Sequence, residues 1–283
     1  MKKLSVVLAV RNEEENIGRC LVSVKNIADE IIVVDEYSTD KTREIAEKLG
    51  AKVFLEPHHD IFHVTKQKAL EKVTGNWVLQ LDADEVVSPE LASQIKLTVN
   101  GNPPAVHNEL FERHQRLLEK RDGRMGKDSG EVTAYFLPRR NIFLGKPLVH
   151  AGVYPDGEIR LVKRGKARFP QKSVHEQIKV DGRVEWLGAD LLHYDSPTLK
   201  RYLMRLNRYT DLKARELRVS KTPKNMFSLL NFTIFKPIIV FSKLFFRHLG
   251  FLDGYRGFLW SFFSALHFPI AYFKYLTSVR SLS

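Results

Sequence analysis

The chain has 283 residues, 43% hydrophobic and 28% charged, which is enough to form a large core and excludes a disordered protein. A single cysteine, Cys20, excludes a disulfide framework and a cysteine-built zinc cluster. The net charge of +12 lies entirely in residues 200–283, which hold 15 basic and 3 acidic residues and 12 of the 18 Phe. A basic, Phe-rich segment favours an anionic membrane surface over nucleic acid as its partner.

The front half alternates short apolar runs with helical patterns. Strands are expected at Ser5–Val10, Ile31–Val34, Lys52–Leu55 and Trp77–Leu81. The first run is too short for a secretory signal and lacks a cleavage site, so we expect an intracellular protein. Helices are expected after the N-cap Asn12, with three Glu residues in the first turn, and at Asp40–Leu49, at Val64–Val73 and from Ser88-Pro89. Strands separated by helices predict an α/β fold with a mainly parallel, Rossmann-like sheet covered by helices on both faces.

Polar residues follow each expected strand, at the edge where open α/β sheets bind ligands. They are Arg11-Asn12, Asp35-Glu36, Glu56 and Asp82-Ala83-Asp84. The glycine fingerprint for dinucleotides and the Walker-type phosphate loop are both absent from the sequence. Carboxylates bind phosphate through a divalent ion, so the pattern predicts an oxygen-rich Mg²⁺ or Mn²⁺ site completed by a substrate's phosphates.

Three segments follow one another along the front half of the chain: SVVLAVRNEE at 5–14, VVDEYSTDKT at 33–42 and NWVLQLDADE at 76–85. Together they resemble the motifs of glycosyltransferase family 2, which has the GT-A fold, a nucleotide-sugar donor and an Asp-x-Asp metal motif. Segments at 138–146, 154–156, 159–161, 174–176 and 251–254 resemble the bacterial lipopolysaccharide-core glucosyltransferase branch. The resemblance implies an inverting enzyme with a UDP-sugar donor. The Gln-x-x-Arg-Trp motif of processive synthases is missing, which suggests that one sugar is added per acceptor.

The resemblance also implies roles for single residues. Asp35 and Glu36 would contact the base, Asp82 the ribose or a metal-bound water, and Asp84 the metal directly. Glu36 and Tyr37 replace the Asp and Gly usual in the family. Glu36 can still accept from a uracil N–H, so uridine stays the expected base, and Tyr37 is expected to reshape the base pocket.

Four further assignments stay open between two readings. Lys66 and Gln67 are expected to reach the nucleotide. The alternative for Lys66 is an ordinary exposed lysine on a helix. Arg11 meets a phosphate or pairs with a glutamate. His193 is a further metal ligand or caps the next helix. Arg160 and Arg164 meet a phosphate or form a solvated basic face.

An inverting transferase needs a general base that takes the proton from the acceptor hydroxyl. Glu176, in Val174-His175-Glu176, is the first choice and Asp156 the second. His175, beside the expected base, would bind the nucleotide or a metal, or support Glu176.

The rest of the chain is expected to serve the acceptor and the membrane. Residues 1–100 would bind the nucleotide sugar, and 101–198 would form the acceptor side, with a polar helix near Glu109–Lys120. Residues 199–283 would be a basic helical tail. Because the longest stretch of the tail without Lys, Arg, Asp or Glu is 17 residues, we expect a helix lying in the membrane interface rather than a span. A helix packed on the catalytic domain, a dimer contact and a re-entrant hairpin are the alternatives.

The leading hypothesis is a metal-dependent transferase at the cytoplasmic face of a bacterial inner membrane. It would move glucose from UDP-glucose to a lipid-linked glycan such as the lipopolysaccharide inner core. A polyprenyl-phosphate sugar transferase and a catalytically silent membrane scaffold are the competing readings. Nucleic acid is not an expected partner.

Overall fold

The computed structural model describes residues 3–170 and 178–277, and the chain forms two compact units. The first, the α/β unit, comprises residues 1–140 and 155–194. The second, the helical unit, comprises residues 141–154 and 195–283. The expected functional division at residues 100 and 198 stays a prediction.

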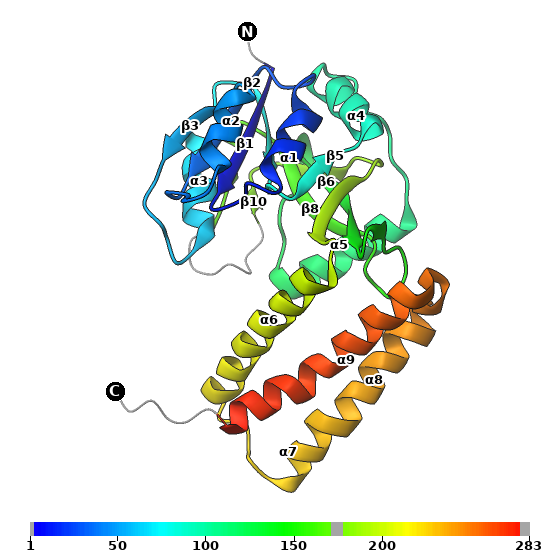
Figure 1. The fold of residues 1–283 in the computed structure, drawn as a ribbon. Helices are drawn as coiled ribbons and strands as arrows, with labels where there is room; N and C mark the ends of the chain where they lie inside the picture. Colours follow the sequence, from blue (N-terminus) through cyan, green and yellow to red (C-terminus); the bar gives the residue numbers. More distant parts are fainter. Residues whose placement is uncertain (1–2, 171–177, 278–283) are drawn as a thin grey trace. The chain divides into compact units, whose positions relative to one another are not determined.

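The α/β unit is built on a mixed sheet with the strand order β3-β2-β1-β4-β8-β6-β12-β5 (Figure 1). The strands are β1 (Leu4–Val10), β2 (Glu30–Asp35), β3 (Lys52–Leu55), β4 (Trp77–Leu81), β5 (Glu85–Val87), β6 (Lys127–Phe143), β8 (Asp156–Lys163) and β12 (Leu191–Ser196). Short strands β7 (Lys146–Pro147) and β11 (Arg183–Trp186) pair with β6, and β9 (Ala167–Arg168) pairs with β10 (Lys179–Val180). The helices of this unit are α1 (Ile17–Val24), α2 (Thr42–Lys48), α3 (Phe62–Glu71), α4 (Pro89–Val99) and α5 (Glu109–Asp122).

The first four strands form the parallel half of the sheet. β1 pairs in parallel with β2 and β4, and β2 pairs in parallel with β3. All seven residues of β1 are buried, as expected for a strand covered on both faces. The second half adds antiparallel pairs, β4 with β8, β8 with β6 and β12 with β5. The predicted α/β architecture is confirmed, and the antiparallel additions come from the part of the chain that the strand pattern left unassigned.

The helices follow the sequence pattern, with one correction. Ser88 caps α4 by accepting a hydrogen bond from the Leu91 N–H at 3.1 Å, and Pro89 occupies the first turn, as predicted. Helix α1 buries Ile17, Cys20, Leu21 and Val24. It begins only at Ile17, so the prediction that Asn12 caps it was wrong. Asn12 lies in the loop between β1 and α1, where the chain turns and gives it a positive φ of 54°. An N-cap residue instead has an extended backbone.

The helical unit consists of long helices joined by short turns. Helix α6 (Leu199–Val219) follows the cap Thr198, and α9 (Gly254–Thr277) packs against it and against α8 (Figure 1). Between them, α7 (Met226–Leu230), the π-helical turns Asn231–Phe235 and Lys243–Arg247, and α8 (Lys236–Ser242) form one continuous helix. A 3₁₀ turn, η3 (Gly250–Asp253), leads into α9.

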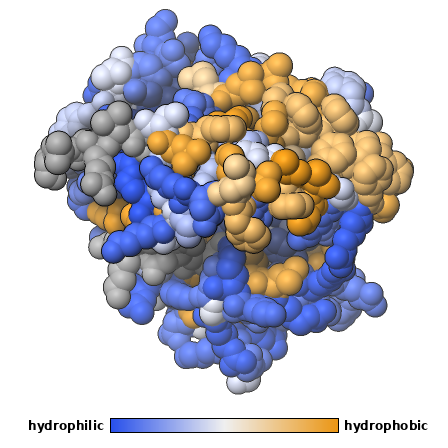
Figure 2. Space-filling view, turned by 90° about the horizontal axis from the view of Figure 1, so that it is seen from below, coloured by the Kyte–Doolittle hydropathy of each residue, from blue (hydrophilic) through white to orange (hydrophobic). Residues whose placement is uncertain are grey.

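The helix Met226–Arg247 differs from the sequence expectation. It has 22 residues, and by length and composition it can cross a membrane. Whether this helix spans a membrane or lies in its interface, as expected from the sequence, stays a prediction. An 18-residue window of this helix has a mean hydropathy of 1.6 in spite of its lysines. Only 6% of that window is buried inside the protein, so most of the helix surface is exposed. Figure 2 shows hydrophobic side chains gathered into one area of the surface, bordered by hydrophilic ones.

Candidate active site

The loops after β1 and β2 are tied to each other by side-chain hydrogen bonds. The Asn12 N–H donates to Ser38 Oγ at 2.8 Å, and Asn12 Oδ1 accepts from the Thr39 N–H at 2.8 Å. The Lys41 N–H donates to the Glu14 carboxylate at 3.0 Å. The first two sequence motifs are therefore one structure, which holds the carboxyl ends of two parallel strands in a fixed relation.

Asp35 ends β2 and is completely buried. Its Oδ1 accepts from the Ser38 N–H at 2.7 Å, whereas its Oδ2 is buried and has no hydrogen-bond partner among the described residues. An unpaired buried carboxylate oxygen is costly and is stabilised by any donor that a ligand brings.

Glu36, the second expected base contact, is already engaged. It is 1% exposed, and its carboxylate contacts His58 Nδ1 at 2.6 Å and accepts from the Thr65 hydroxyl. Of the two acidic residues, Asp35 has the oxygen left for a ligand.

Lys66 is buried, so the reading as an exposed helix lysine was wrong. Its Nζ lies 2.5 Å from Asp82 Oδ1, which links α3 to the end of β4. Gln67 accepts from the Phe169 N–H at 2.9 Å and donates to Glu71 at 3.0 Å. Both residues therefore face groups of the α/β unit, and their contact with a nucleotide stays a prediction.

Asp82 lies at the centre of a charged network. Arg160 Nη2 donates to Asp82 Oδ2 at 2.6 Å and to Glu85 at 2.7 Å. Burial raises the pKa of Asp82, but the charges of Arg160 and Lys66 outweigh that effect and hold it well below its usual value. Asp82 is therefore ionised at neutral pH, and each of its two oxygens contacts a cation.

Sequence reasoning missed three members of this network, Gln80, Glu85 and Arg139. It considered Arg160 only as a phosphate contact or as part of a solvated basic face. Arg160 is 4% exposed and cannot belong to a solvated face. Arg139 contacts Glu85 at 3.4 Å and Asp156 at 2.7 Å, so the second choice for the general base is held by a guanidinium. The only signal in the sequence was the acidic cluster at 82–85, whose positive partners Arg139 and Arg160 follow more than 50 residues later.

Asp84 and His193 are brought together by the sheet register. His193 on β12 pairs with Glu85 on β5, and the Tyr194 N–H donates to the Asp84 carbonyl at 2.8 Å. His193 Nε2 lies 3.6 Å from Asp84 Oδ1. A carboxylate and an imidazole at this separation are a donor set that suits a divalent ion such as Mn²⁺.

The remaining expected residues are placed differently. Arg11 is exposed at the end of β1. Glu176 and His175 lie outside the described residues, so the expected base and its neighbour stay predictions.

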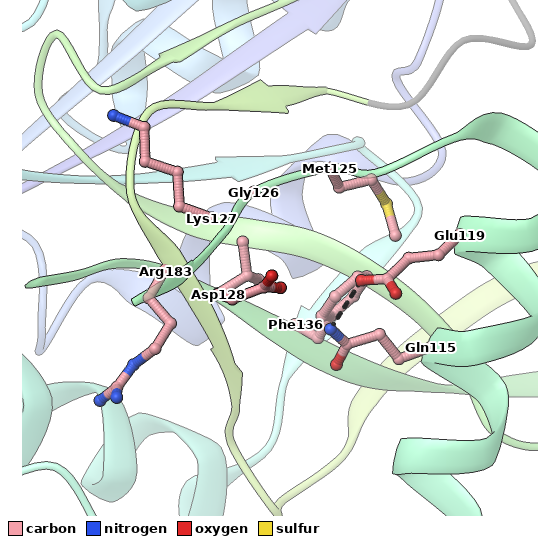
Figure 3. Close-up of a pocket in the computed structure, with 9 residues that line it drawn as sticks. Gln115, Glu119, Met125, Gly126, Lys127, Asp128, Phe136 and Arg183 are labelled. Carbon is pink, nitrogen blue, oxygen red and sulfur yellow. Dashed lines mark hydrogen bonds between the residues drawn. The ribbon is translucent and has the colours of Figure 1, made fainter. Parts of the chain in front are cut away.

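A separate cavity of about 240 Å³ lies beside α5 and contains no residue predicted for the site. Gln115 donates to Glu119 at 3.0 Å there, and Lys127 and Arg183 point away from this pair (Figure 3). Its lining combines the exposed charged residues Lys127 and Asp128 with the buried side chains of Met125 and Phe136.

Comparisons with known proteins identify the family of the chain. The family model described as glycosyl transferase family 2 matches residues 5–137. An uncharacterised glycosyltransferase of Rickettsia typhi is 31% identical over all of this chain and 88% of the relative. The lipopolysaccharide core biosynthesis glycosyltransferase LpsC of Rhizobium meliloti is 27% identical over 93% of this chain and 90% of the relative.

Among solved structures, a mannosyltransferase from Pyrobaculum calidifontis, in complex with GDP-Man and Mn²⁺, is 14% identical and matches with a TM-score of 0.49. That match covers 98% of this chain and 87% of the mannosyltransferase. The 31% identity to a glycosyltransferase over the whole of this chain, together with the family match at residues 5–137, shows that the chain belongs to glycosyl transferase family 2 and is a glycosyltransferase.

Proposed function

We propose that this glycosyltransferase moves one glucose from UDP-glucose, with inversion and with a divalent metal, to a lipid-linked glycan such as the lipopolysaccharide inner core. The observation that carries the proposal is the unpaired oxygen of Asp35 at the carboxyl end of a parallel strand, where open sheets bind nucleotides. A uracil ring offers one N–H, which this single acceptor can take. Guanine offers two neighbouring N–H donors. The single unpaired oxygen of Asp35 could accept from only one of them.

Metal binding is proposed at Asp84 and His193. The carboxylate and imidazole lie close enough to share an ion, while Asp82 is already neutralised by Lys66 and Arg160. The ion would offset negative charge on the leaving diphosphate. Asp82 then acts as a fixed anion that orients Lys66 and Arg160, rather than as a metal ligand.

The general base is proposed to be Glu176. A catalytic base must be able to reach the acceptor hydroxyl, and the Asp156 carboxylate is already engaged by Arg139 at 2.7 Å. Glu176→Gln should keep the affinity for UDP-glucose and reduce transfer by about 10²-fold or more. Unchanged transfer in Glu176→Gln would exclude this assignment, and Asp156→Asn would be measured next.

The acceptor is proposed from the helical unit and from the relative LpsC, whose name places it in lipopolysaccharide core synthesis. A basic unit with an exposed apolar helix suits an enzyme held at the cytoplasmic face of the inner membrane. The same helix favours a second candidate, a polyprenyl-phosphate sugar transferase, because it meets the length required of a membrane span.

A transfer assay separates the two acceptors. Full-length protein receives UDP-glucose or GDP-mannose with Mn²⁺ or with chelator, and either a purified inner-core glycolipid or a polyprenyl phosphate. Metal-dependent glucose transfer from UDP-glucose to the glycolipid supports the proposal. Transfer to the polyprenyl phosphate alone would establish the second candidate and contradict the first.

A further inference from the structure

A cavity of about 310 Å³ lies within the helical unit, between one face of α6 and one face of α9. Its α6 wall is formed by Tyr202, Arg205, Leu206 and Tyr209, which are spaced three, four and seven residues apart and so share one helix face. Binding pockets for small molecules have volumes of about 300–1,000 Å³, so this one has room for one or two ring-sized groups rather than a long chain.

The aromatic part of the cavity is closely packed. Tyr202 is 8% exposed, and its ring packs against Phe143 at 5.0 Å, Trp260 at 5.8 Å and Phe263 at 5.4 Å between centroids. Tyr209, one turn beyond Arg205, is 47% exposed. The cavity therefore has a fixed aromatic floor and one aromatic ring open to a ligand.

The polar part lies at the end of β12. Arg205 forms an ion pair with Asp195, and Asp195 also accepts from the Ser196 hydroxyl at 3.0 Å. The guanidinium lies 5.7 Å from the Tyr209 ring centroid. A half-exposed aromatic ring therefore stands beside a group that offers N–H donors and carboxylate acceptors together.

We propose that this cavity binds a neutral sugar ring of the acceptor glycan. The C–H face of a pyranose packs on an aromatic ring. Its hydroxyls can donate to the Asp195 carboxylate and accept from the Arg205 guanidinium. The proposal rests on the proposed function, because it gives that acceptor a binding site.

Two other occupants fit the cavity less well. An acyl chain would cover Arg205 and Asp195 with hydrocarbon, and burying polar groups without hydrogen bonds from the ligand is unfavourable. A strongly anionic group would have to compete with Asp195 for the guanidinium.

The test uses full-length protein in lipid nanodiscs and ligand-observed NMR with three probes: methyl glucoside, glucose 6-phosphate and octanol. The variants are Tyr209→Ala, which removes the open ring, and Arg205→Lys, which keeps the charge but loses the paired donors. Arg208→Gln is the matched control, an exposed cation on the same helix that does not line the cavity.

Methyl glucoside should bind wild type and Arg208→Gln, and its dissociation constant should rise about tenfold in Tyr209→Ala and Arg205→Lys. In the transfer assay the same two variants should raise the KM for the glycan acceptor and leave the KM for UDP-glucose within about twofold. Octanol binding without sugar binding, stronger binding of the phosphate than of the neutral sugar, or equal KM values in all variants would each overturn the proposal.

The two proposals fail separately. If wild type binds methyl glucoside in a Tyr209-dependent manner but transfers no glucose to a glycan, the cavity assignment stands and the proposed reaction is wrong. If transfer occurs with unchanged acceptor KM in Tyr209→Ala, the reaction stands and the cavity assignment is wrong.

Discussion

Tyr37 occupies a backbone position that favours glycine. Its φ is +52°, in the left-handed region, and its side chain is 57% exposed beside the buried Asp35 and Glu36. A side chain with a Cβ is disfavoured in this conformation by about 1–2 kcal/mol relative to glycine. The strain lies next to the proposed base pocket, as backbone strain in functional loops often does.

Tyr37→Gly should therefore raise the free energy of unfolding by about 1 kcal/mol, after part of the gain is lost to the greater entropy of the unfolded glycine. Urea denaturation measures the change. Tyr37→Ala is the control, because it removes the ring and keeps the Cβ. An equal gain in both variants would show that the exposed ring, rather than the backbone, is the source of the effect.

Asp82 should contribute to stability in a pH-dependent way. Its folded pKa is lowered by Arg160 and Lys66, whereas an unfolded aspartate titrates near about 3.9. Because the folded pKa is lowered, ionised Asp82 stabilises the folded state fully above the unfolded pKa, at about pH 4 and higher. This stabilisation is lost as the pH falls from there through the folded pKa.

Asp82→Asn should lower the free energy of unfolding at pH 7 by about 1–3 kcal/mol, because Lys66 loses its carboxylate partner and Arg160 loses one of its two carboxylate partners. The difference from wild type should shrink when the denaturation is repeated at pH 3. The exposed residue Asp60 supplies the control, since Asp60→Asn should change little at either pH. A difference that stays constant from pH 7 to pH 3 would contradict the assigned charge state.

Asp253 connects two elements of the helical unit. Its carboxylate accepts from the N–H groups of Val149 and His150 at 3.2 Å and 2.8 Å, and from His150 Nδ1 at 2.9 Å. The motif Phe251–Gly254, noted in the sequence for its resemblance, thus fixes the segment after β7 to the turn before α9.

Asp253→Ala should cost about 1–3 kcal/mol of unfolding free energy, because it leaves three donors without their partner. Asp211→Ala is a suitable comparison, since Asp211 is 52% exposed and forms a surface ion pair with Lys274 worth under about 1 kcal/mol. If the two alanine variants unfold at the same urea concentration, the three hydrogen bonds do not stabilise this junction.

The elements themselves were largely predictable, because they follow from local pattern. The buried run of β4, the stripe of α1 and the cap of α4 all appear in the sequence as the structure has them. The antiparallel partners β8 and β6 did not, since their pairing depends on the fold rather than on neighbours in sequence.

The site was predictable only in part, for the same reason. Asp35 and Asp84 follow strands and could be located from the strands alone. The burial of Lys66 depends on Asp82 across 16 positions, and that of Arg160 on Asp82 across 78, so no local pattern reveals it. His193 reaches Asp84 through the β5–β12 register, which the sequence does not specify.

At the scale of the whole molecule, the exposed apolar helix should govern membrane binding. Ile238 and Ile239 are 60% and 62% exposed, so replacing them leaves the core intact. Each large aliphatic side chain transferred out of water contributes about 1.5–3 kcal/mol. Ile238→Ser with Ile239→Ser should therefore weaken binding to vesicles containing anionic lipid by at least about tenfold.

Vesicle sedimentation measures this loss. Val22 and Leu97 give a matched control in the α/β unit, where they are 59% and 49% exposed, and changing both to Ser should leave vesicle binding unchanged. Equal binding by both double variants and wild type would contradict a membrane role for this helix.

The most direct test of the proposed donor and metal site is calorimetric binding of UDP-glucose, UDP-galactose and GDP-mannose to wild type and Asp84→Asn, each with Mn²⁺ and with chelator. We predict that wild type binds UDP-glucose most tightly and that chelator weakens this binding. We also predict that Asp84→Asn loses the metal dependence while keeping the same free energy of unfolding. Equal affinity with and without metal, or unchanged metal dependence in Asp84→Asn, would contradict the proposed site.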